Sequence, residues 1–423
     1  MKFALACWGS RGDVEPCVAV GRELLRRGHD VCIAVPPHMV DFAQATGLPA
    51  VAWGADLLPY VLAQSKFLNC LVGSPWRIRE LIRLRGEISE LYISCREEMT
   101  RTLTPLAAGV DLLITMHNFE NLAANVAEYH DIPLATMHLF LLRPNGQFLP
   151  FLPSPLGNLG MTAYWWLSWR MAKKVDDAQR RQLLGLPETT APWSRRIAER
   201  GSLEIQAYDE VLFPGLTAEW AKFDGHRPLV GTLTLGLPGD ADEEVASWIA
   251  AGTPPIFFSF GSLPVESPAD TLAMIDSVCA QLGERALVCA DGTDFSNVTH
   301  GEHVKVAGTM NHGAIFPTCR AVVHRGSVGI TAAGLRAGVP TLILWKLSQQ
   351  LVWGAQVKRL KTGTARRWSA TTEKSLIADL RTILAPQYAA RAREIATRMT
   401  SPAESVAAAA DLVENFARLR RVV

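Results

Sequence analysis

Residues 324–350 constrain the fold of this chain more than any other stretch. They begin with the segment His-Arg-Gly-Ser-Val-Gly at 324–329, continue as a helical pattern, and end in the apolar run 341–345 and a pair of glutamines. A short apolar run, 321–323, precedes them. The order strand, glycine-containing turn, helix, strand is the building block of a parallel α/β sheet. It also places free backbone N–H groups at a helix N-terminus, where a phosphate or diphosphate can bind.

The same order occurs at the start of the chain. The apolar run 3–7 is followed by a turn with Gly9 and Gly12, a helical pattern that begins near Pro16, and a second apolar run at 31–35. In an open parallel sheet, the turn after the first strand is a common place for a ligand. We therefore expect a second ligand-binding turn here.

The α/β pattern restarts after a segment rich in glycine and acidic residues, which reads as a linker. We expect two doubly wound α/β domains that face each other across a cleft. The predicted parts are a first domain at 1–235, a linker at 236–252, a second domain at 253–400, and a final helix at 401–423 that is able to cross back onto the first domain.

Composition and missing motifs exclude several classes of protein. The 42 Lys and Arg residues nearly balance the 41 Asp and Glu residues, so a nucleic-acid partner is not expected. The eight cysteines are scattered without a C-x-x-C pair, which argues for reduced thiols in a cytosolic protein. Neither a signal peptide nor an apolar run of about 18 residues is found. The chain also lacks a dinucleotide-binding G-x-G-x-x-G and a Walker A sequence.

The region 139–202 is expected to be irregular and to form binding loops, because six prolines interrupt it. An aromatic cluster at 163–169 is followed by Arg170, Lys173 and Lys174. Aromatic side chains beside cations occur at membrane interfaces. A helix packed in the core or against an apolar ligand explains them as well, and is the preferred interpretation. We expect a cytoplasmic protein, and peripheral contact with the inner face of the membrane stays open.

Together these landmarks resemble the nucleotide-sugar glycosyltransferases of the UDP-glucuronosyltransferase and antibiotic glycosyltransferase superfamily, which have the GT-B fold. That family reads H-x-G-x-x-G and then G-V-P, as residues 324–340 do. Residues 9–16 are similar to its G-S-x-G-D-x-x-P, and 260–262 to its F-G-S turn. Residues 306–312 lie where its nucleobase-contacting segment falls. The closest likeness is to actinobacterial enzymes that glycosylate lipopeptides such as glycopeptidolipids.

The resemblance implies an inverting, metal-independent transfer of a hexose from a TDP- or UDP-linked sugar to a hydroxyl group. It makes Asp13 the general base that takes the hydroxyl proton. The residues alone suggest another role, since Asp at a helix N-terminus commonly caps the helix, and the helix dipole weakens it as a base. The donor contacts implied by the resemblance are Ser10, Arg11, Gly12, Gly261, Ser262, Met310, His324, Gly326, Ser327, Val328, Gly329, Gln349 and Gln350.

The nucleotide sugar is a co-substrate, and no cofactor or metal is predicted. The triplet Asp240-Ala241-Asp242 could suggest a cation site, but it stands beside two further acids ahead of a helical pattern. A solvated, acidic helix start explains it better.

The end of the stretch 324–350 departs from the family pattern. Where the family has Asp-Gln, this chain has Gln349-Gln350. A glutamine can accept and donate hydrogen bonds but carries no charge, so its bonds to sugar hydroxyls are weaker. We therefore expect a deoxyhexose such as rhamnose or 6-deoxytalose, transferred to a hydrophobic acceptor such as a lipopeptide or glycolipid.

Other functions stay open. The chain could be a non-catalytic nucleotide-sugar-binding helper of an active transferase, or a glucosyltransferase for a macrolide, sterol or glycopeptide. A nucleotide-sugar epimerase would share the architecture. His117 and His138 each follow an apolar run and could line the acceptor side, although each is more simply explained as an ordinary histidine with its hydrogen bonds satisfied.

Overall fold

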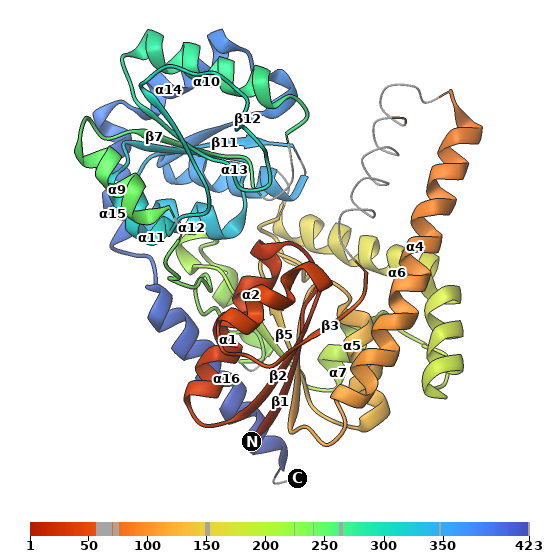
Figure 1. Cartoon of the computed structure of the whole chain (residues 1–423). Helices are drawn as coiled ribbons and strands as arrows, with labels where there is room; N and C mark the ends of the chain where they lie inside the picture. The colour runs from red at the N-terminus through yellow and green to blue at the C-terminus, as the bar shows by residue number, and fades with distance from the viewer. Residues whose placement is uncertain are drawn as a thin grey trace. The chain divides into compact units, whose positions relative to one another are not determined.

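The structure is a computed structural model of the chain. It describes residues 1–55, 70, 76–148, 153–223, 225–239, 241–261, 265–346 and 348–421; among these, the side chains of Ser89, Tyr92, Ser348, Gln349 and Arg421 are not described. The chain divides into two compact units (Figure 1). Unit 1 comprises Met1–Ala207, Leu216–Val230 and Val406–Val423, and unit 2 comprises Tyr208–Gly215 and Gly231–Ser405.

Unit 1 is built on a six-stranded parallel sheet in the order β3-β2-β1-β4-β5-β6. Its strands are β1 (Lys2–Ala6), β2 (Asp30–Val35), β3 (Ala50–Ala52), β4 (Leu112–Met116), β5 (Leu134–His138) and β6 (Leu203–Gln206). Its helices are α1 (Arg11–Arg26), α2 (Val40–Ala45), α4 (Ile78–Leu106), α5 (Glu120–His130), α6 (Ser154–Leu184), α7 (Trp193–Glu199), α8 (Leu216–Trp220) and most of α16 (Pro402–Arg421). Strands β4 and β5 are buried at every residue, as expected for a parallel sheet covered on both faces.

Unit 2 repeats this plan with the strand order β12-β11-β10-β7-β8-β9. Its strands are β7 (Ile256–Ser259), β8 (Ala286–Cys289), β9 (Val304–Ala307), β10 (Ala321–His324), β11 (Thr341–Trp345) and β12 (Gly363–Arg367). Its helices are α9 (Asp242–Ala250), α10 (Pro268–Leu282), α11 (His312–Ile315), α12 (Val328–Arg336), α13 (Ser348–Leu360), α14 (Glu373–Ile383) and α15 (Pro386–Ala396). Neighbouring Phe257 and Phe258 enter separate core clusters, as the two-residue period of a strand requires.

Each sheet has one point at which the strand order reverses. In unit 1 the chain passes from β1 to β2 on one side and from β4 to β5 on the other, so the reversal lies between β1 and β4. In unit 2 it lies between β7 and β10. At such a point the loops at the carboxyl ends of two adjacent strands separate and leave a crevice for a ligand. The prediction of two doubly wound α/β domains is confirmed.

Two segments differ from the sequence-based expectation. The predicted linker, 236–252, contains helix α9, whose Val245 and Ile249 are buried in the core of unit 2 against Phe257, and the division between the units falls at Val230 and Gly231. The supposedly irregular region 139–202 contains the long helix α6. Its prolines do not break this helix because Pro153 and Pro155 lie at the N-terminus, where the missing N–H groups carry no helical bond.

The last helix, α16, spans the point in the sequence at which unit 2 ends and the last segment of unit 1 begins. Helix α16 begins at Pro402, and its residues from Val406 onward lie in unit 1. There Arg27 Nη1 lies 2.6 Å from Asp411 Oδ1, and His29 Nε2 lies 2.6 Å from Glu414 Oε1. The chain thus returns to its first unit at its end. No helix in the described part of the chain is long and apolar enough to span a membrane.

Candidate active site

Asp13 lies in the first turn of α1, directly after the glycine-containing turn that follows β1. Ser10 is the N-cap residue, with the extended backbone that this position needs (φ −79°, ψ 176°). Asp13 Oδ2 accepts hydrogen bonds from the Ser10 backbone N–H (2.9 Å) and from the Ser10 hydroxyl (3.0 Å). Asp13 therefore does cap the helix, as its sequence position suggested. The capping bonds occupy one carboxylate oxygen and leave Oδ1 for other chemistry.

Gly9 fixes the position of this carboxylate. Its backbone φ of +143° is one that residues with a side chain rarely adopt. A Cβ added at Gly9 would lie only 2.4 Å from Asp13 Oδ2, so no other residue fits without moving the carboxylate. The turn before α1 therefore needs glycine both for its conformation and for the space that Asp13 fills.

The structure gives His117 and His138 different surroundings, although the sequence offered no reason to distinguish them. His138 is fully buried, and its ring nitrogens have partners in Glu120 (2.8 Å), Gln206 and Thr136 (both 3.2 Å). His117 follows β4 at the strand-order reversal, and its Nε2 lies 3.8 Å from Asp13 Oδ1. No local sequence pattern predicts this neighbourhood, because only the pairing of β1 with β4 brings His117 to Asp13.

A buried ionic cluster lies beside this site at the start of α5. Glu120 accepts two hydrogen bonds from Arg143 (2.7 and 3.0 Å). Arg143 also donates to Glu204, which accepts a further hydrogen bond from Arg227 (3.0 Å). Burial alone would raise the pKa of Glu120, but Arg143 and His138 bring its pKa below the ordinary value. The cluster anchors the loop after β5, which carries Arg143. No local sequence signal identifies it, since its members come from five separate segments.

Two further predicted donor contacts, Arg11 and Gly12, lie at the start of α1. Arg11 makes an ion pair with Glu15 (3.2 Å) and lies over the Phe42 ring at 5.0 Å. Gly12 is exposed in the first turn of α1. In unit 1 the Arg11 guanidinium is therefore engaged by its own helix and by α2.

In unit 2 the main predicted group is His324, the last residue of β10. Its Nδ1 accepts a hydrogen bond from the Gly326 backbone N–H at 3.0 Å, which leaves the proton of the neutral ring on Nε2. His324 Nε2 is buried and has no partner in the described part of the chain. Burial, with a smaller effect of His312, lowers the pKa of His324 to about 3. The ring is thus a neutral hydrogen-bond donor whose acceptor is missing.

The helix N-terminus predicted beside His324 is present. Ser327 is the N-cap of α12, and its side chain makes no capping hydrogen bond in the described part of the chain. The N–H groups of Val328 and Gly329 have no helical partner because they lie in the first turn. Gly326 has a φ of +91°, and a Cβ there would lie 2.9 Å from Ile343 Cγ2. Only glycine allows this turn to lie so close to β11. Anions commonly bind at helix N-termini with such free N–H groups, and here a side-chain donor, His324, lies at the edge of the turn.

The strand register places further predicted residues on the same sheet edge. Ser259 of β7 is level with His324, and Gly261 follows it with a φ of +74°. Ser262 lies outside the described residues. Gln350 Oε1 accepts a hydrogen bond from the Lys346 backbone N–H (2.8 Å), and the side chain of Gln349 is not described.

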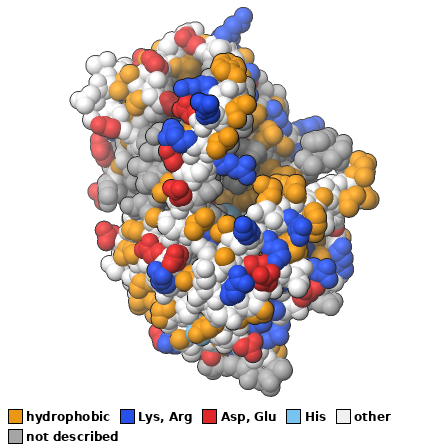
Figure 2. Space-filling model, turned by 90° about the vertical axis from the view of Figure 1, so that its right-hand side faces the viewer, with side chains coloured by type: hydrophobic (Ala, Val, Ile, Leu, Met, Phe, Trp, Pro, Cys, Tyr) orange, Lys and Arg blue, Asp and Glu red, His pale blue; other side chains and the backbone are white. Residues whose placement is uncertain are grey.

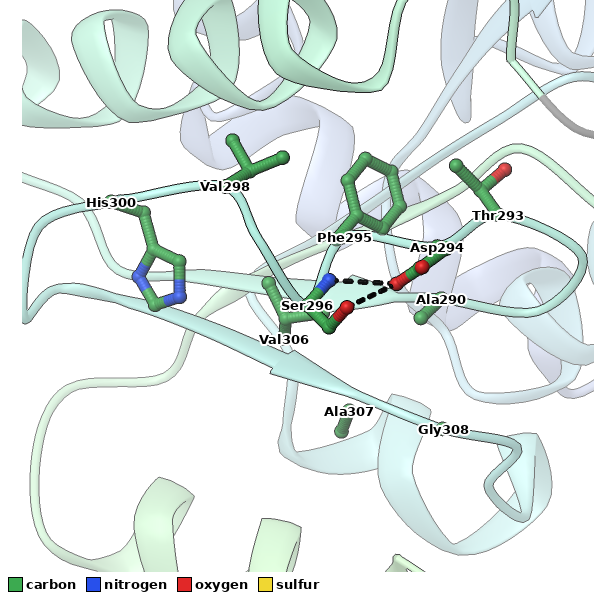
Figure 3. A pocket seen from close by; sticks show the side chains of 10 residues that line it. All are labelled: Ala290, Thr293, Asp294, Phe295, Ser296, Val298, His300, Val306, Ala307 and Gly308. Atoms are coloured by element: carbon green, nitrogen blue, oxygen red, sulfur yellow. Dashed lines mark hydrogen bonds between the residues drawn. The ribbon is translucent and has the colours of Figure 1, made fainter.

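A pocket of about 330 Å³ lies at this edge, near the carboxyl ends of β8 and β9 (Figure 3). It is lined by Ala290, Thr293, Asp294, Phe295, Ser296, Val298, His300, Val306, Ala307 and Gly308. The register puts Cys289 and Ala307 level with Ser259 and therefore with His324. Three strand spacings, about 14 Å, separate His324 from Ala307. The Met310 side chain does not line the pocket, since it is buried in the core against α9.

No group of three or more potential ligand residues that could hold a metal ion occurs in the described ranges. Asp242 of the acidic triplet accepts backbone hydrogen bonds from Gly239 and Asn311, each at 2.7 Å. Asp240 lies outside the described residues. Asp242, the first residue of α9, thus holds the backbone ahead of the helix against the turn at Asn311.

Two parallel α/β units, each with a glycine-containing turn at the reversal of its strand order, form the architecture of the GT-B glycosyltransferases. Residues 3–92 match the model of the glycosyltransferase family 28 N-terminal domain, and residues 274–414 match that of the erythromycin biosynthesis protein CIII-like C-terminal domain. A glycosyltransferase of Mycobacterium tuberculosis is 54% identical over 423 residues, which is 100% of both chains. The chain belongs to this family of glycosyltransferases.

Solved structures agree at the level of the fold. The glycosyltransferase VinC in complex with dTDP has a TM-score of 0.64 and 17% identity, over 98% of this chain and 100% of that one. The spinosyn rhamnosyltransferase SpnG has a TM-score of 0.60 and 14% identity, over 98% of this chain and 99% of that one. The GT-B fold is therefore established for this chain.

Proposed function

We propose that this glycosyltransferase moves a deoxyhexose, such as rhamnose or 6-deoxytalose, from a TDP- or UDP-linked sugar to a hydroxyl of a hydrophobic acceptor. The acceptor class is a lipopeptide or glycolipid, with a glycopeptidolipid as the model case. The observation that carries the proposal is His324, a buried neutral donor without an acceptor among the described residues, next to a helix N-terminus whose N-cap side chain makes no capping bond.

The donor diphosphate is assigned to this end of α12. Backbone N–H groups and the His324 Nε2–H supply fixed hydrogen bonds, and the helix dipole favours the negative charge. Charge develops on the leaving diphosphate in the transition state, and donors fixed in advance stabilise it without reorganising. We infer that the reaction needs no metal ion for this purpose.

The nucleoside is assigned to the pocket beside β8 and β9. Its volume of about 330 Å³ lies at the lower end of the range for small-molecule sites. Phe295 and Val298 offer apolar surface, and Asp294 and Ser296 offer polar groups on the same loop. We assign to the Gly308 backbone, which lines the pocket, the donor contact that the family resemblance implied for Met310.

Asp13 is assigned as the general base. Its Oδ1 makes no capping bond, and its side chain is about one quarter exposed, so a hydroxyl group can reach it. The acceptor oxygen attacks the anomeric carbon, the diphosphate leaves with the bonding electrons, and the hydroxyl proton passes to Asp13. Attack on the face opposite the leaving group inverts the anomeric configuration.

The exposed surface of helix α6 favours the proposal of a hydrophobic acceptor. Six of its large apolar side chains are more than half exposed: Leu156, Leu159, Tyr164, Trp166, Leu167 and Met171. Figure 2 views the side on which α4 and α6 lie in Figure 1, and hydrophobic side chains gather there beside Lys and Arg. Exposed apolar patches of this kind mark binding surfaces. Acceptors with lipid chains would also bring the enzyme to the inner face of the membrane.

We assign the class of sugar, a deoxyhexose, from the residue type at position 349, which is glutamine. An uncharged amide in place of the family's carboxylate weakens the bonds to ring hydroxyls, which favours a sugar with fewer of them. The rhamnosyl donor named for SpnG is consistent with this choice. A Gln349→Asp variant should gain activity with UDP-glucose and lose it with dTDP-rhamnose.

The test combines dTDP and UDP calorimetry with transfer assays that pair dTDP-rhamnose, dTDP-6-deoxytalose and UDP-glucose with lipopeptide, macrolide and sterol acceptors. Asp13→Asn should bind dTDP normally and lose at least about 100-fold in kcat. His324→Gln should weaken dTDP binding about 10-fold or more. Absence of transfer from every donor would overturn the proposal, and full turnover by Asp13→Asn would point to a different base.

A further inference from the structure

The backbone between β4 and α5 passes through a strained conformation at Phe119. Phe119 is the N-cap residue of α5, and its φ of 59° and ψ of 24° are left-handed. A bulky side chain rarely adopts this conformation. The N-cap position is ordinarily an extended Ser, Thr, Asp or Asn, whose side chain bonds the helix, and phenylalanine cannot make such a bond. Local preference therefore does not explain why a phenylalanine stands here.

The Phe119 ring contacts two tryptophans from neighbouring turns. It meets the Trp8 ring edge to face at a centroid distance of 5.2 Å, and the Trp53 ring at 6.4 Å. Trp8 Nε1 donates to the Ala55 carbonyl oxygen at 3.1 Å, and Trp53 Nε1 donates to the Met99 carbonyl oxygen at 2.9 Å. The three rings thus connect the turns that follow β1, β3 and β4 at one edge of the sheet.

Asn118 contacts the same turn through its side-chain amide. Asn118 Nδ2 donates to the Trp8 carbonyl oxygen at 2.9 Å. This carbonyl belongs to the planar peptide unit that ends at the Gly9 nitrogen. The hydrogen bond therefore restricts the orientation of that peptide plane. The register between β1 and β4 ends at the pair Ala6 and Thr115, so the bond from Asn118 lies beyond the ladder of the sheet.

The turn that these contacts hold carries Asp13. The Asp13 carboxylate fills the space in which a Cβ at Gly9 would stand, and it accepts the Ser10 backbone N–H at 2.9 Å. The orientation of the peptide plane before Gly9 therefore decides where the carboxylate lies. Glycine restricts its own backbone least, so a turn that contains it depends on outside contacts for a single conformation. Strained residues such as Phe119 are concentrated at active sites, where the surrounding structure holds them.

We propose that Asn118 and Phe119 are positioning residues, which fix the turn 8–10 from the loop after β4 and thereby the Asp13 carboxylate. Neither residue needs to touch a substrate for this role. The inference rests on the proposed function, because it takes Asp13 as the base. Positioning predicts a loss of kcat in molecules that stay folded, whereas packing alone predicts a loss of stability with kcat retained per folded molecule.

The first test needs no substrate. Hydrogen exchange in peptides that cover residues 7–14, measured by mass spectrometry, reports on the Ser10 N–H that Asp13 holds. Asn118→Ala and Phe119→Gly should each speed this exchange at least about 10-fold. The matched control Asp131→Gly changes the left-handed residue at the other end of α5, which has a φ of 50° and is exposed, and should leave the exchange unchanged. Unchanged exchange in Asn118→Ala and Phe119→Gly would overturn the proposal.

The second test uses the donor and acceptor pair for which transfer is measured. Asn118→Ala and Phe119→Gly should lower kcat about 10- to 100-fold, because a small displacement of a reacting group is costly. The acceptor KM should stay within about 3-fold, and calorimetry with dTDP should be unchanged. Phe119→Tyr keeps the ring and should retain at least about half of the turnover. Asp131→Gly should keep the wild-type kcat.

Thermal unfolding separates positioning from packing. Glycine adopts a φ near 59° without strain, so Phe119→Gly should unfold at the same temperature as Phe119→Ala or higher. Both variants lack the ring, and both should lose turnover to the same extent. If kcat instead follows stability, so that the more stable variant turns over faster, Phe119 acts through packing and the proposal is wrong.

The outcomes separate this inference from the function on which it rests. If Asp13→Asn abolishes transfer but Asn118→Ala and Phe119→Gly keep the full kcat, the base stands and the positioning role is wrong. If Asp13→Asn transfers normally, the assigned base is wrong and the inference falls with it. If no donor is used at all, the proposed function fails, and the exchange rates alone decide whether this loop positions Asp13.

Discussion

Gly9 and Asp13 depend on each other through a contact that leaves no room for a side chain at position 9. The turn has a φ of +143° at Gly9, and the Asp13 carboxylate fills the space in which a Cβ would stand. A capping aspartate elsewhere in a protein would tolerate a small shift. Here a shift of the carboxylate would also change its distance from His117, which is 3.8 Å.

We predict that Gly9→Ala lowers kcat/KM at least about 10-fold, because a displacement near 1 Å at a reacting group can cost about 100-fold. It should also destabilise the protein by about 1–3 kcal/mol through backbone strain. Gly28→Ala is the matched control: it has a φ of +85° but nothing within 4 Å of an added Cβ.

The control should lose stability without losing turnover per folded molecule. Thermal unfolding and steady-state kinetics on both variants provide the comparison. Equal loss of stability with full turnover in Gly9→Ala would show that this contact does not position the carboxylate.

At the scale of elements, α6 presents two different faces. Trp169 is buried, and its Nε1 donates to Thr189 Oγ1 at 3.2 Å, whereas Trp166 and Leu167 in the preceding turn are exposed. The helix is held from its other end by Arg180, whose Nη1 donates to Asn125 Oδ1 at 2.6 Å. A helix anchored in this way can present an apolar face without support from a bound ligand.

We predict that Leu167→Gln raises the KM for a lipid-bearing acceptor about 5- to 10-fold, since burial of a leucine side chain on binding contributes about 1.5–3 kcal/mol when complete. Stability should change by no more than about 0.5 kcal/mol, because the side chain is exposed. The matched control is Leu419→Gln on α16, which is also exposed. Equal acceptor KM values for the two variants would exclude this face of α6 from acceptor binding.

At the scale of the whole molecule, the end of the chain completes its first unit. Helix α16 buries Ala409, Ala410, Val413 and Ala417 completely, and Arg420 donates to the backbone oxygens of Arg200 and Gly201 at 2.9 Å. The segment from Val406 onward therefore contributes to the core of unit 1, although more than 170 residues of unit 2 precede it. Unit 1 is continuous in space and discontinuous in sequence.

We predict that Val413→Asp lowers the free energy of unfolding by about 3 kcal/mol or more, because it buries an unpaired charge. Leu419→Asp, on the same helix but exposed, should change it by no more than about 0.5 kcal/mol. Urea unfolding followed by circular dichroism measures both. Similar midpoints for the two variants would mean that α16 does not stabilise unit 1.

The sequence by itself determined the fold class and the two glycine-containing turns. Apolar runs separated by helical periods predict parallel strands, and a glycine turn between strand and helix predicts free N–H groups at a helix N-terminus, because both depend on residues that are close in the chain. His324 and the N-terminus of α12 were found in this way. The sequence also favoured an irregular region at 139–202 and a linker at 236–252, where proline and glycine counts misled because helix termini use the same residues.

Only the tertiary structure decided which residues become neighbours across the strand-order reversal. It placed His117 beside Asp13, satisfied His138 with Glu120, and buried Met310 in the core. It also returned α16 to unit 1. These outcomes depend on the order of the strands in each sheet, and strand order is set by packing between segments far apart in the chain, which no local pattern of residues encodes.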